Sequence, residues 1–589
     1  MTNKKNSVEK KFFAVNNDNW GHKWGYRDSE FLLNKDGSVS MTGNRYELCG
    51  FDMPDFIPYV EEMLDMTVDV DDVLPEVDNK PVVEAQINQA FTDAIKATFA
   101  EDRYSFGDAE RLMHSAGQTT DEIYNVVFAK IDKVADMAFY IESEDEAKKL
   151  IELAIEHDVC LIPYGGGTSV SNALQIPQFE TRMVVAVDTR RMDKIESIDV
   201  ENRRVVVQAG ILGGKLEELL EAEGLTVGHE PDSIELSTLG GWISTNASGM
   251  KKNRYGNIED IVENVTMITP NGVVEQVNPI TRASIGVSSQ NMLLGSEGNF
   301  GIITKATLKV HTLPESSDYN SALFHDWETG VAFMYELSKS GAVPASARLM
   351  DNAQFRFGQA LNAKPSGLKV WIKKLEKFVV LNVKKFDPYK MVVTSFKLEG
   401  SKDEVDLQQK TIKRLTNKYN GMVGGSENGK KGYNLTFAIA YIRDFMTRYR
   451  IIGETMETSV PWSKVHEVCE AATNKINELH KKHNIPGKPY ISYRVPQIYH
   501  TGVCIYFMFA MSIKGVKNPI EVFNSIEYAM REAIMEAGGS ISHHHGVGKL
   551  RKDFMKGTLS PASIEMLKQV KTGHDPKNIF GVANNVFFE

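Results

Sequence analysis

Cysteine is scarce in this chain. Four cysteines, Cys49, Cys160, Cys469 and Cys504, are spread over 589 residues, and no two of them form a CxxC pair. This spacing excludes a zinc ribbon, a thioredoxin-type dithiol and a small secreted module held together by disulfides. Such cysteine usage is typical of a protein from a reducing compartment.

Long apolar runs are also missing. The longest uncharged apolar run in the last third of the chain, Gly502–Ile513, falls far short of the ~20 residues of a membrane-spanning helix. Its β-branched and aromatic residues predict a buried strand instead. Residues 1–11 carry charge but no apolar stretch, so we expect no secretory signal there. The C-terminal residues 586–589 do not match a peroxisomal SKL-type signal.

An excess of basic residues is absent as well. The chain has 67 Lys and Arg against 78 Asp and Glu, a net charge of −11 at pH 7. This balance argues against nucleic acid as a partner and against a polybasic membrane anchor. With 42% hydrophobic and 25% charged residues the composition is that of a globular protein, and the length predicts about three or four domains.

Strand and helix patterns become clear from about residue 133. Strands are expected at 137–141, 159–162, 183–188 and 204–208, and helices after a capping box at Ser143–Glu146 and over 215–222. Further along, a strand at 391–398 precedes a helix capped by Ser401–Glu404. We predict an α+β fold with an N-terminal segment at 1–125, one domain at 126–314, a second α+β domain at 315–555 and a C-terminal segment at 556–589.

Four loops are rich in glycine and hydroxyl residues. The first, Pro163–Ser169, follows a predicted strand but lacks both the G-x-G-x-x-G of a Rossmann fold and the G-K-[ST] of a Walker A loop. Alone it would be a tight turn. The other three lie at Asp232–Gly241, Thr245–Gly249 and Gly295–Ile303. Together, four such loops favour a long extended ligand, such as a dinucleotide, lying along backbone groups.

These loops resemble a known family. Tyr164–Ser169, Asp232–Thr238, Thr245–Ser248 and Glu297–Ile303 are similar to the FAD-contacting segments of the vanillyl-alcohol oxidase/PCMH flavoprotein superfamily. Within it, the chain from about Trp20 to Phe580 resembles the alkyldihydroxyacetonephosphate synthases. The stretches that carry this resemblance are Ile162–Ser171, Gly228–Ser233, Gly240–Asp260, Pro344–Asn352, Ala440–Asp444, Cys504–Phe507 and Ser542–Arg551.

The resemblance implies a two-subdomain PCMH-type FAD-binding domain, a cap over the flavin and a C-terminal segment that returns to the FAD domain. It implies non-covalent FAD, because Gly167 and Thr168 stand where the superfamily often has its flavin-linked histidine. The residues expected to bind the cofactor are Pro163, Tyr164, Gly165, Gly166, Gly167, Thr168, Ser169, Asp232, Ser233, Ile234, Glu235, Leu236, Ser237, Thr238, Thr245, Asn246, Ala247, Ser248, Glu297, Gly298, Asn299, Phe300, Gly301, Ile302 and Ile303. Asn246 departs from the family, which often has arginine there.

Three consecutive histidines, His543, His544 and His545, form the most unusual polar cluster. A purification tag is excluded because the triplet is internal, and a metal site is disfavoured because successive side chains diverge. A solvated loop and a proton-transfer group near neutral pH are the other interpretations. Members of the superfamily that oxidise D-lactate or glycolate usually carry Glu-His-Gly here, whereas the synthases carry His-His-His-Gly.

Tyr506 lies in the apolar stretch 501–513, where most tyrosines are core residues. The resemblance places it at the family's proton donor/acceptor position, which would require a nearby cation to lower its pKa from about 10. Arg443 and Arg348 are the candidate cations and phosphate ligands, although most arginines only form surface ion pairs. By resemblance Arg443 binds substrate, Arg348 supports activity, and His229 is a further active-site residue.

The resemblance implies ether-lipid synthesis: acyl-dihydroxyacetone phosphate and a long-chain fatty alcohol give alkyl-dihydroxyacetone phosphate and a fatty acid, with no net redox change. It also implies a homodimer, a peripheral membrane contact and a peroxisomal location. The alternatives are a flavin-dependent 2-hydroxyacid dehydrogenase, for D-lactate or glycolate, and a flavin-binding scaffold without catalysis. No metal and no nucleic acid are expected.

Overall fold

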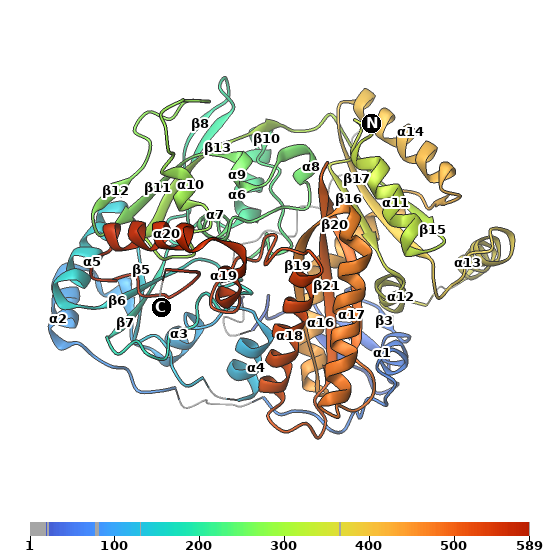
Figure 1. The fold of residues 1–589 in the computed structure, drawn as a ribbon, viewed down its shortest axis with the longest axis horizontal. Coiled ribbons are helices and arrows are strands. Elements are labelled where there is room, and N and C mark those ends of the chain that lie inside the picture. The colour runs from blue at the N-terminus through green and yellow to red at the C-terminus, as the bar shows by residue number, and fades with distance from the viewer. Residues whose placement is uncertain (1–18, 20–22, 77–81, 130, 365–366, 588–589) are drawn as a thin grey trace.

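The computed structural model describes residues 19, 23–76, 82–129, 131–364 and 367–587. The predictions about residues 1–11 and about Phe588 and Glu589, and the start of the resemblance at Trp20, lie outside these residues. No helix in the described part of the chain is long and apolar enough to cross a membrane. Three large sheets with helices packed on them confirm the predicted α+β class (Figure 1).

The first sheet has the strand order β4-β5-β7-β6 and ends in the first glycine loop. Its strands are β4 (Tyr104–Ser105), β5 (Met137–Tyr140), β6 (Cys160–Tyr164) and β7 (Val184–Asp188). β5 and β6 pair in parallel with β7, and helix α5 (Glu144–His157) connects β5 to β6. The predicted capping box is half formed: Ser143 Oγ accepts from the Glu146 N–H at 3.2 Å, but the Glu146 carboxylate accepts from Glu142 N–H. β4 joins this sheet from within the predicted N-terminal segment, and the domain boundaries themselves stay a prediction.

The second sheet is antiparallel, with the order β12-β11-β13-β9-β8. Its strands are β8 (Ile195–Asp199), β9 (Arg204–Gln208), β11 (Val262–Thr269), β12 (Gly272–Val274) and β13 (Ile302–Lys309). Helices α6 (Gly213–Glu221) and α7 (Leu239–Thr245) bury Leu216, Leu220 and Trp242 with Val205 and Val207 of β9. The strand predicted at 204–208 and the helix predicted at 215–222 are thereby confirmed, the helix within two residues.

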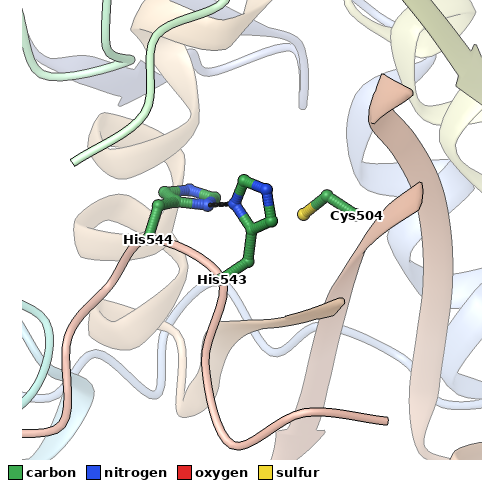
Figure 2. A group of neighbouring side chains, drawn as sticks. All are labelled: Cys504, His543 and His544. Atoms are coloured by element: carbon green, nitrogen blue, oxygen red, sulfur yellow. Dashed lines mark hydrogen bonds between the residues drawn. The ribbon is translucent and has the colours of Figure 1, made fainter. Parts of the chain in front are cut away.

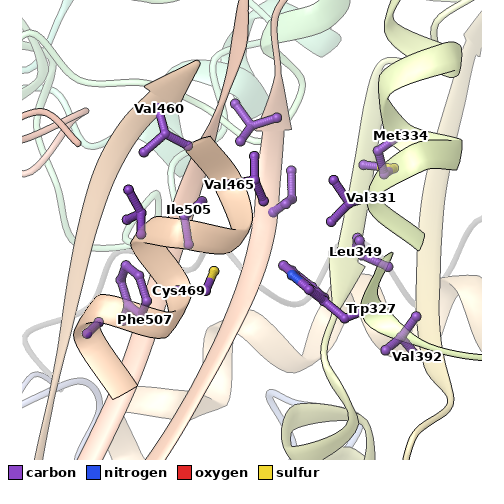
Figure 3. Close-up of a cluster of buried hydrophobic side chains, with 14 of the residues drawn as sticks. Trp327, Val331, Met334, Leu349, Val392, Val460, Val465, Cys469, Ile505 and Phe507 are labelled. Atoms are coloured by element: carbon purple, nitrogen blue, oxygen red, sulfur yellow. The ribbon is translucent and has the colours of Figure 1, made fainter. Parts of the chain in front are cut away.

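The cap contains a seven-stranded sheet in the order β18-β15-β17-β16-β20-β21-β19. Its strands are β15 (Ser316–Phe324), β16 (Ser346–Met350), β17 (Val392–Gly400), β18 (Met422–Val423), β19 (Ile451–Pro461), β20 (Tyr490–Ile498) and β21 (Gly502–Ser512). Helices α11 (Trp327–Ser338), α14 (Lys402–Lys418), α17 (Val465–Lys482) and α18 (Pro519–Glu536) share one apolar core with this sheet. Figure 3 shows part of it, with Val465 of α17 beside Ile505 of β21 and Val331 of α11 beside Leu349 of β16.

Side-chain alternation divides β21 between two environments. Ile505 and Phe507 point into the helix-covered core, whereas Tyr506 and Met508 line a cavity on the other face. Successive residues of a strand face opposite sides of the sheet, so one apolar strand contributes to both. The predicted strand at 502–513 is confirmed, and so is the helix after the Ser401–Glu404 box, whose two reciprocal hydrogen bonds are both present.

The N-terminal residues pack against the cap. Strands β1 (Phe31–Leu33), β2 (Val39–Met41) and β3 (Asp52–Met53) and helix α1 (Phe56–Leu64) form an apolar core with α12 (Asn352–Ala360) and α16 (Ile439–Arg448). The C-terminal helix α20 (Pro561–His574), red in Figure 1, lies instead over the half of the molecule that contains the first two sheets, called the flavin half below because the resemblance implies FAD there. Just after it, Ile579 and Phe580 join the core of the first sheet. The other helices of four or more residues outside the cap are α2 (Gln89–Thr98), α3 (Asp108–Met113), α4 (Thr120–Phe128), α8 (Lys252–Tyr255), α9 (Ile258–Ile261), α10 (Gln290–Leu293) and α19 (Met555–Thr558).

Candidate active site

The four glycine loops meet at one cavity of about 410 Å³ between the flavin half and the cap. The predicted cofactor residues that line it are Pro163, Tyr164, Gly165, Gly166, Gly167, Thr168, Ser169, Asp232, Ser233, Ser237, Thr238, Thr245, Ala247, Ser248, Glu297, Gly298, Gly301 and Ile303. The remaining ones, Ile234, Glu235, Leu236, Asn246, Asn299, Phe300 and Ile302, are not among its lining residues.

The non-lining residues have other surroundings. Ile234 and Phe300 belong to the core of the second sheet, and Glu235 accepts a hydrogen bond from Tyr46 Oη at 2.9 Å. Asn246 is exposed at the end of α7, with φ of 52°, a left-handed conformation that asparagine tolerates better than most residues. Asparagine at this position therefore suits the end of the helix.

The loops present backbone rather than bulky side chains to the cavity, and this fits FAD. A Cβ on Gly166 would collide with the carbonyl oxygen of Leu236, and Gly298 has φ of +77° beside Pro163. In the part of the chain that the structure describes, the N–H groups of Gly166, Gly167 and Thr168 donate no hydrogen bond to the protein. Free N–H groups in a glycine-rich concavity suit the pyrophosphate of a dinucleotide.

A row of polar side chains crosses the cap sheet above these loops. The strand register pairs Tyr506 of β21 with Arg494 of β20 on one side and with Glu457 of β19 on the other. Directly paired residues share a sheet face, so all three side chains lie on the cavity side. The Arg494 guanidinium lies 4.1 Å from the centre of the Tyr506 ring and 3.2 Å from the Asp232 carboxylate.

The environment of Tyr506 corrects one expectation. Burial raises the pKa of its phenol above the usual value of about 10, and the positive charge of Arg494 opposes this only in part. The expected cation was Arg443 or Arg348, and the expected shift was downward. The cation over the ring is Arg494, and the phenol is protonated at neutral pH.

Glu457 holds the histidine triplet in place. Its buried carboxylate accepts from the Ser542 hydroxyl at 2.7 Å and from the backbone N–H groups of all three histidines. His544 and His545 line the cavity with their rings 6.0 and 5.5 Å from the Tyr506 ring, whereas His543 does not line it. One carboxylate thus fixes the loop directly beside Tyr506.

The charges of this cluster follow from burial and from its neighbours. Burial alone would raise the pKa of Glu457, but nearby positive charge outweighs burial and holds that pKa well below its usual range: His545 and His544 contribute only while they are protonated, and Arg551 contributes throughout. Burial lowers the pKa of His543 to about 3 and also lowers those of His544 and His545. We conclude that the three imidazoles are neutral and Glu457 is ionised at neutral pH.

The predicted arginines line the cavity, and His229 does not. Arg348 is buried, and its guanidinium donates to Thr436 Oγ1 at 3.2 Å. Arg443 pairs with Asp444 at 2.8 Å and donates to the Gln118 side chain at 3.0 Å. His229 packs 4.7 Å from the Trp242 ring, and neither of its ring nitrogens has a partner among the described residues. Its predicted contact with substrate stays a prediction.

Several residues of the site escaped the sequence reasoning, among them Glu457, which lies behind the cavity lining. Arg494 and Glu457 are charges inside apolar strand sequences, and this was the one signal that could have drawn attention to them. Gln118 and Thr436 carry no local signal, because they reach the site only through the packing of distant elements.

Cys504 lies beside the histidines, as Figure 2 shows. Among the described residues, Cys504, His543 and His544 each place one potential metal-ligand atom within 4.8 Å of the others. The Nδ1 atoms of the two histidines are 2.9 Å apart and hydrogen-bonded, closer than the roughly 3.3 Å expected between two nitrogens around tetrahedral zinc. The absence of a metal stays a prediction.

The other end of the cavity is apolar. It lies between the N-terminal helix α1, the cap helices α12 and α16, and strand β21. Its lining includes Phe56, Tyr59, Val60, Met63, Leu64, Phe357, Ile442, Met446 and Met508. One cavity therefore has an end lined by three arginines and two histidines and another end whose lining carries no charged side chain.

Two family models match the chain. A FAD binding domain matches residues 135–278, and the C-terminal domain of FAD linked oxidases matches residues 313–582. A solved structure of p-cresol methylhydroxylase superimposes with a TM-score of 0.64 at 12% identity, over 86% of this chain and 99% of that one. This likeness shows the shared PCMH-type fold and nothing finer.

Two further comparisons are closer. The alkyldihydroxyacetonephosphate synthase of Caenorhabditis elegans is 41% identical over 565 residues, which cover 95% of this chain and 94% of the relative. A solved alkyldihydroxyacetonephosphate synthase structure superimposes with a TM-score of 0.83 at 27% identity, over 95% of this chain and 98% of that one. With the PCMH-type fold, the four loops at one cavity and this identity over almost the whole length, the chain belongs to the alkyldihydroxyacetonephosphate synthase family.

Proposed function

We propose that this protein exchanges the acyl group of acyl-dihydroxyacetone phosphate for a long-chain fatty alcohol, giving alkyl-dihydroxyacetone phosphate and a fatty acid. The supporting observation is one cavity that joins a cationic end, an apolar end and four dinucleotide-type loops. The family's reaction needs all three in contact. A 2-hydroxyacid dehydrogenase would not need the long apolar end.

FAD is the cofactor, and the four loops are the residues that would hold it. When bound, FAD supplies the reactive ring that makes the substrate's reacting carbon exchangeable. We expect it to be non-covalently bound. The protein itself supplies binding, orientation and proton transfer.

The cationic end suits the phosphate of the substrate. The positive charges of Arg348 and Arg494 both interact with the carboxylate of Asp232. Two positive charges beside one negative charge leave a net positive charge that can attract an anion. Arg443, which pairs with Asp444, adds a third guanidinium, and one guanidinium can donate two parallel hydrogen bonds to a phosphate. We assign the phosphate to these arginines and proton exchange at the reacting carbon to Tyr506, with His544 and His545 beside it.

The decisive experiment is incubation of the purified, flavin-loaded protein with acyl-dihydroxyacetone phosphate and a radiolabelled long-chain alcohol. We expect a labelled ether that survives alkaline hydrolysis, together with free fatty acid. Reduction of the flavin by D-lactate or glycolate, without ether product, would support the dehydrogenase instead. A yellow protein without either reaction would be the scaffold.

We also propose a peripheral membrane contact through helix α13 (Leu368–Phe378), which projects from the edge of the cap in Figure 1. Trp371, Leu375 and Phe378 follow helical spacing and are 72%, 65% and 55% exposed. The segment 367–390 contains seven lysines and two acidic residues. The net charge of −11 concealed this local basic cluster. An exposed apolar face among lysines suits an anionic lipid surface, which would bring both lipid substrates close to the cap.

Two further properties rest on the family alone. We propose a homodimer, to be tested by sedimentation analysis of the purified protein, and a peroxisomal location, to be tested by imaging the tagged full-length chain in cells.

A further inference from the structure

A chain of hydrogen bonds leads from the cavity to Tyr499 in the turn between β20 and β21. His544 Nδ1 lies 2.9 Å from His543 Nδ1, and His543 Nε2 lies 2.6 Å from the Tyr499 hydroxyl (the histidine pair is shown in Figure 2). Tyr499 is only half-buried, and its hydroxyl also reaches Gln497 Oε1 at 3.2 Å. Three side chains therefore connect the cavity with a partly exposed tyrosine.

The two imidazoles allow only two arrangements of protons. A neutral imidazole carries one N–H, so if His544 donates through Nδ1, His543 must donate through Nε2 to Tyr499. If Tyr499 donates instead, His543 donates through Nδ1 and His544 carries its proton on Nε2. In the described part of the chain, His544 Nε2 has no hydrogen-bond partner, although the side chain lines the cavity. The chain can thus present either a base or an acid to the cavity.

We infer that His544, His543 and Tyr499 form a proton relay whose two arrangements serve the two halves of the proposed reaction. The inference rests on that proposed function. When the acyl group leaves, His544 Nε2–H protonates the departing carboxylate oxygen, each link passes one proton inward, and Tyr499 takes one from solvent. When the alcohol adds, its O–H bond breaks as the ether C–O bond forms. His544 Nε2 accepts that proton, and Tyr499 releases one to solvent.

This cycle returns every group to its starting state. One proton enters with the fatty acid's departure and one leaves with the alcohol's addition, so no net charge accumulates in the buried site. The Glu457 carboxylate accepts hydrogen bonds from the backbone N–H groups of His543 and His544, which keeps the two imidazoles of the relay in position. Lys252 Nζ lies 3.4 Å from the centre of the Tyr499 ring, and burial raises the pKa of that phenol, so Tyr499 is protonated between transfers.

The test is Tyr499→Phe, which removes only the hydroxyl of the chain. We expect kcat for ether formation to fall about 10²-fold, the lower end of what one proton-transfer group contributes, with KM for both substrates and flavin content unchanged. Exogenous imidazole should restore part of the rate, and His543→Gln combined with Tyr499→Phe should be no slower than His543→Gln alone. Tyr419→Phe is the matched control, because its hydroxyl bonds to Glu336 at 2.9 Å outside the site.

An unchanged kcat in Tyr499→Phe contradicts the relay. A rate loss that imidazole does not restore, or that comes with a raised KM, contradicts it as well, because it indicates a structural effect. Absence of ether product from the wild type contradicts the proposed function, and the relay with it. Ether formation by the wild type with a full rate in the variant contradicts the relay alone.

Discussion

Tyr506 is surrounded by groups from three separate elements: Arg494 over its ring, Glu457 opposite it on β19, and two histidines beside it. Because this arrangement surrounds a protonated phenol, we expect Tyr506→Phe to lower ether formation by at least about 10²-fold while the protein keeps its flavin. Activity and flavin absorbance of the purified variant are the measurements. Tyr493→Phe is the control, since Tyr493 packs edge-on against Trp327 on the other side of the sheet. Full activity of Tyr506→Phe would disprove the assignment.

We expect His229 to make the folding stability of the protein sensitive to acid. Burial lowers its pKa from about 6.5 to about 3, so below pH 6.5 the unfolded chain takes up a proton that the folded chain does not. Folding stability is therefore lost as the pH falls, at about 1.4 kcal/mol per unit between these two values. We expect His229→Leu to reduce the loss of unfolding free energy between pH 6.5 and 5 by about 2 kcal/mol, measured in urea. The exposed His466→Leu should change it little.

The same variant tests the predicted role of His229. If the side chain contacts substrate, His229→Leu will raise KM at neutral pH. If it is only buried against Trp242, KM will stay the same and the acid sensitivity alone will change.

The parts of the candidate site that are contiguous motifs could be predicted from the sequence. The contacts that depend on how distant strands pair could not. The glycine loops and the histidine triplet are contiguous in sequence, so local pattern and resemblance found them. Glu457 precedes Arg494 by 37 residues and Tyr506 follows Arg494 by 12, and the three become neighbours only because β19, β20 and β21 pair at one register. Sequence alone does not define that register, since a shift by one residue would turn each side chain to the other face.

Elements with complete local signals were also predicted well. The Ser401–Glu404 box gives a helix that starts at Lys402, and the apolar stretch 502–513 gives a strand. At Ser143 the pattern was correct, but Glu146 turned to the neighbouring Glu142 N–H instead. A capping motif predicts where a helix begins, whereas the hydrogen bonds at its N-terminus depend also on the conformation of the preceding backbone.

Helix α13 is the element with the clearest expected behaviour at a membrane. Trp371→Glu together with Leu375→Glu should abolish co-sedimentation with vesicles that contain anionic phospholipid, because both exposed apolar anchors become charged. Wild-type Trp371 fluorescence should shift to the blue when such vesicles are added. Leu407→Glu, on the exposed face of α14, is the matched control and should bind as wild type. Equal binding of both variants would rule out this contact.

At the scale of the molecule, Tyr46 joins three parts of the chain. Its hydroxyl donates to Glu235 of the flavin half at 2.9 Å and lies 3.0 Å from the Tyr441 hydroxyl of the cap helix α16. Tyr46→Phe would leave these buried polar groups without that partner, at a cost of about 1–3 kcal/mol in unfolding free energy. We expect flavin release and loss of helical signal to coincide on heating, and both at a lower temperature than in wild type. Tyr389→Phe, on the exposed Tyr389, should melt as wild type. Separate transitions for the two signals would show that the halves unfold independently.

The row formed by Arg494, Tyr506 and Glu457 also bears on how this chain can vary. The three side chains contact one another only in the observed strand register. A deletion within β19, β20 or β21 would change that register and separate the group. The connection between β19 and β20 includes α17, and residues outside the strands do not take part in the pairing itself. Length changes among related chains should therefore accumulate in such connections, and the three strands should be inherited as one block of fixed length.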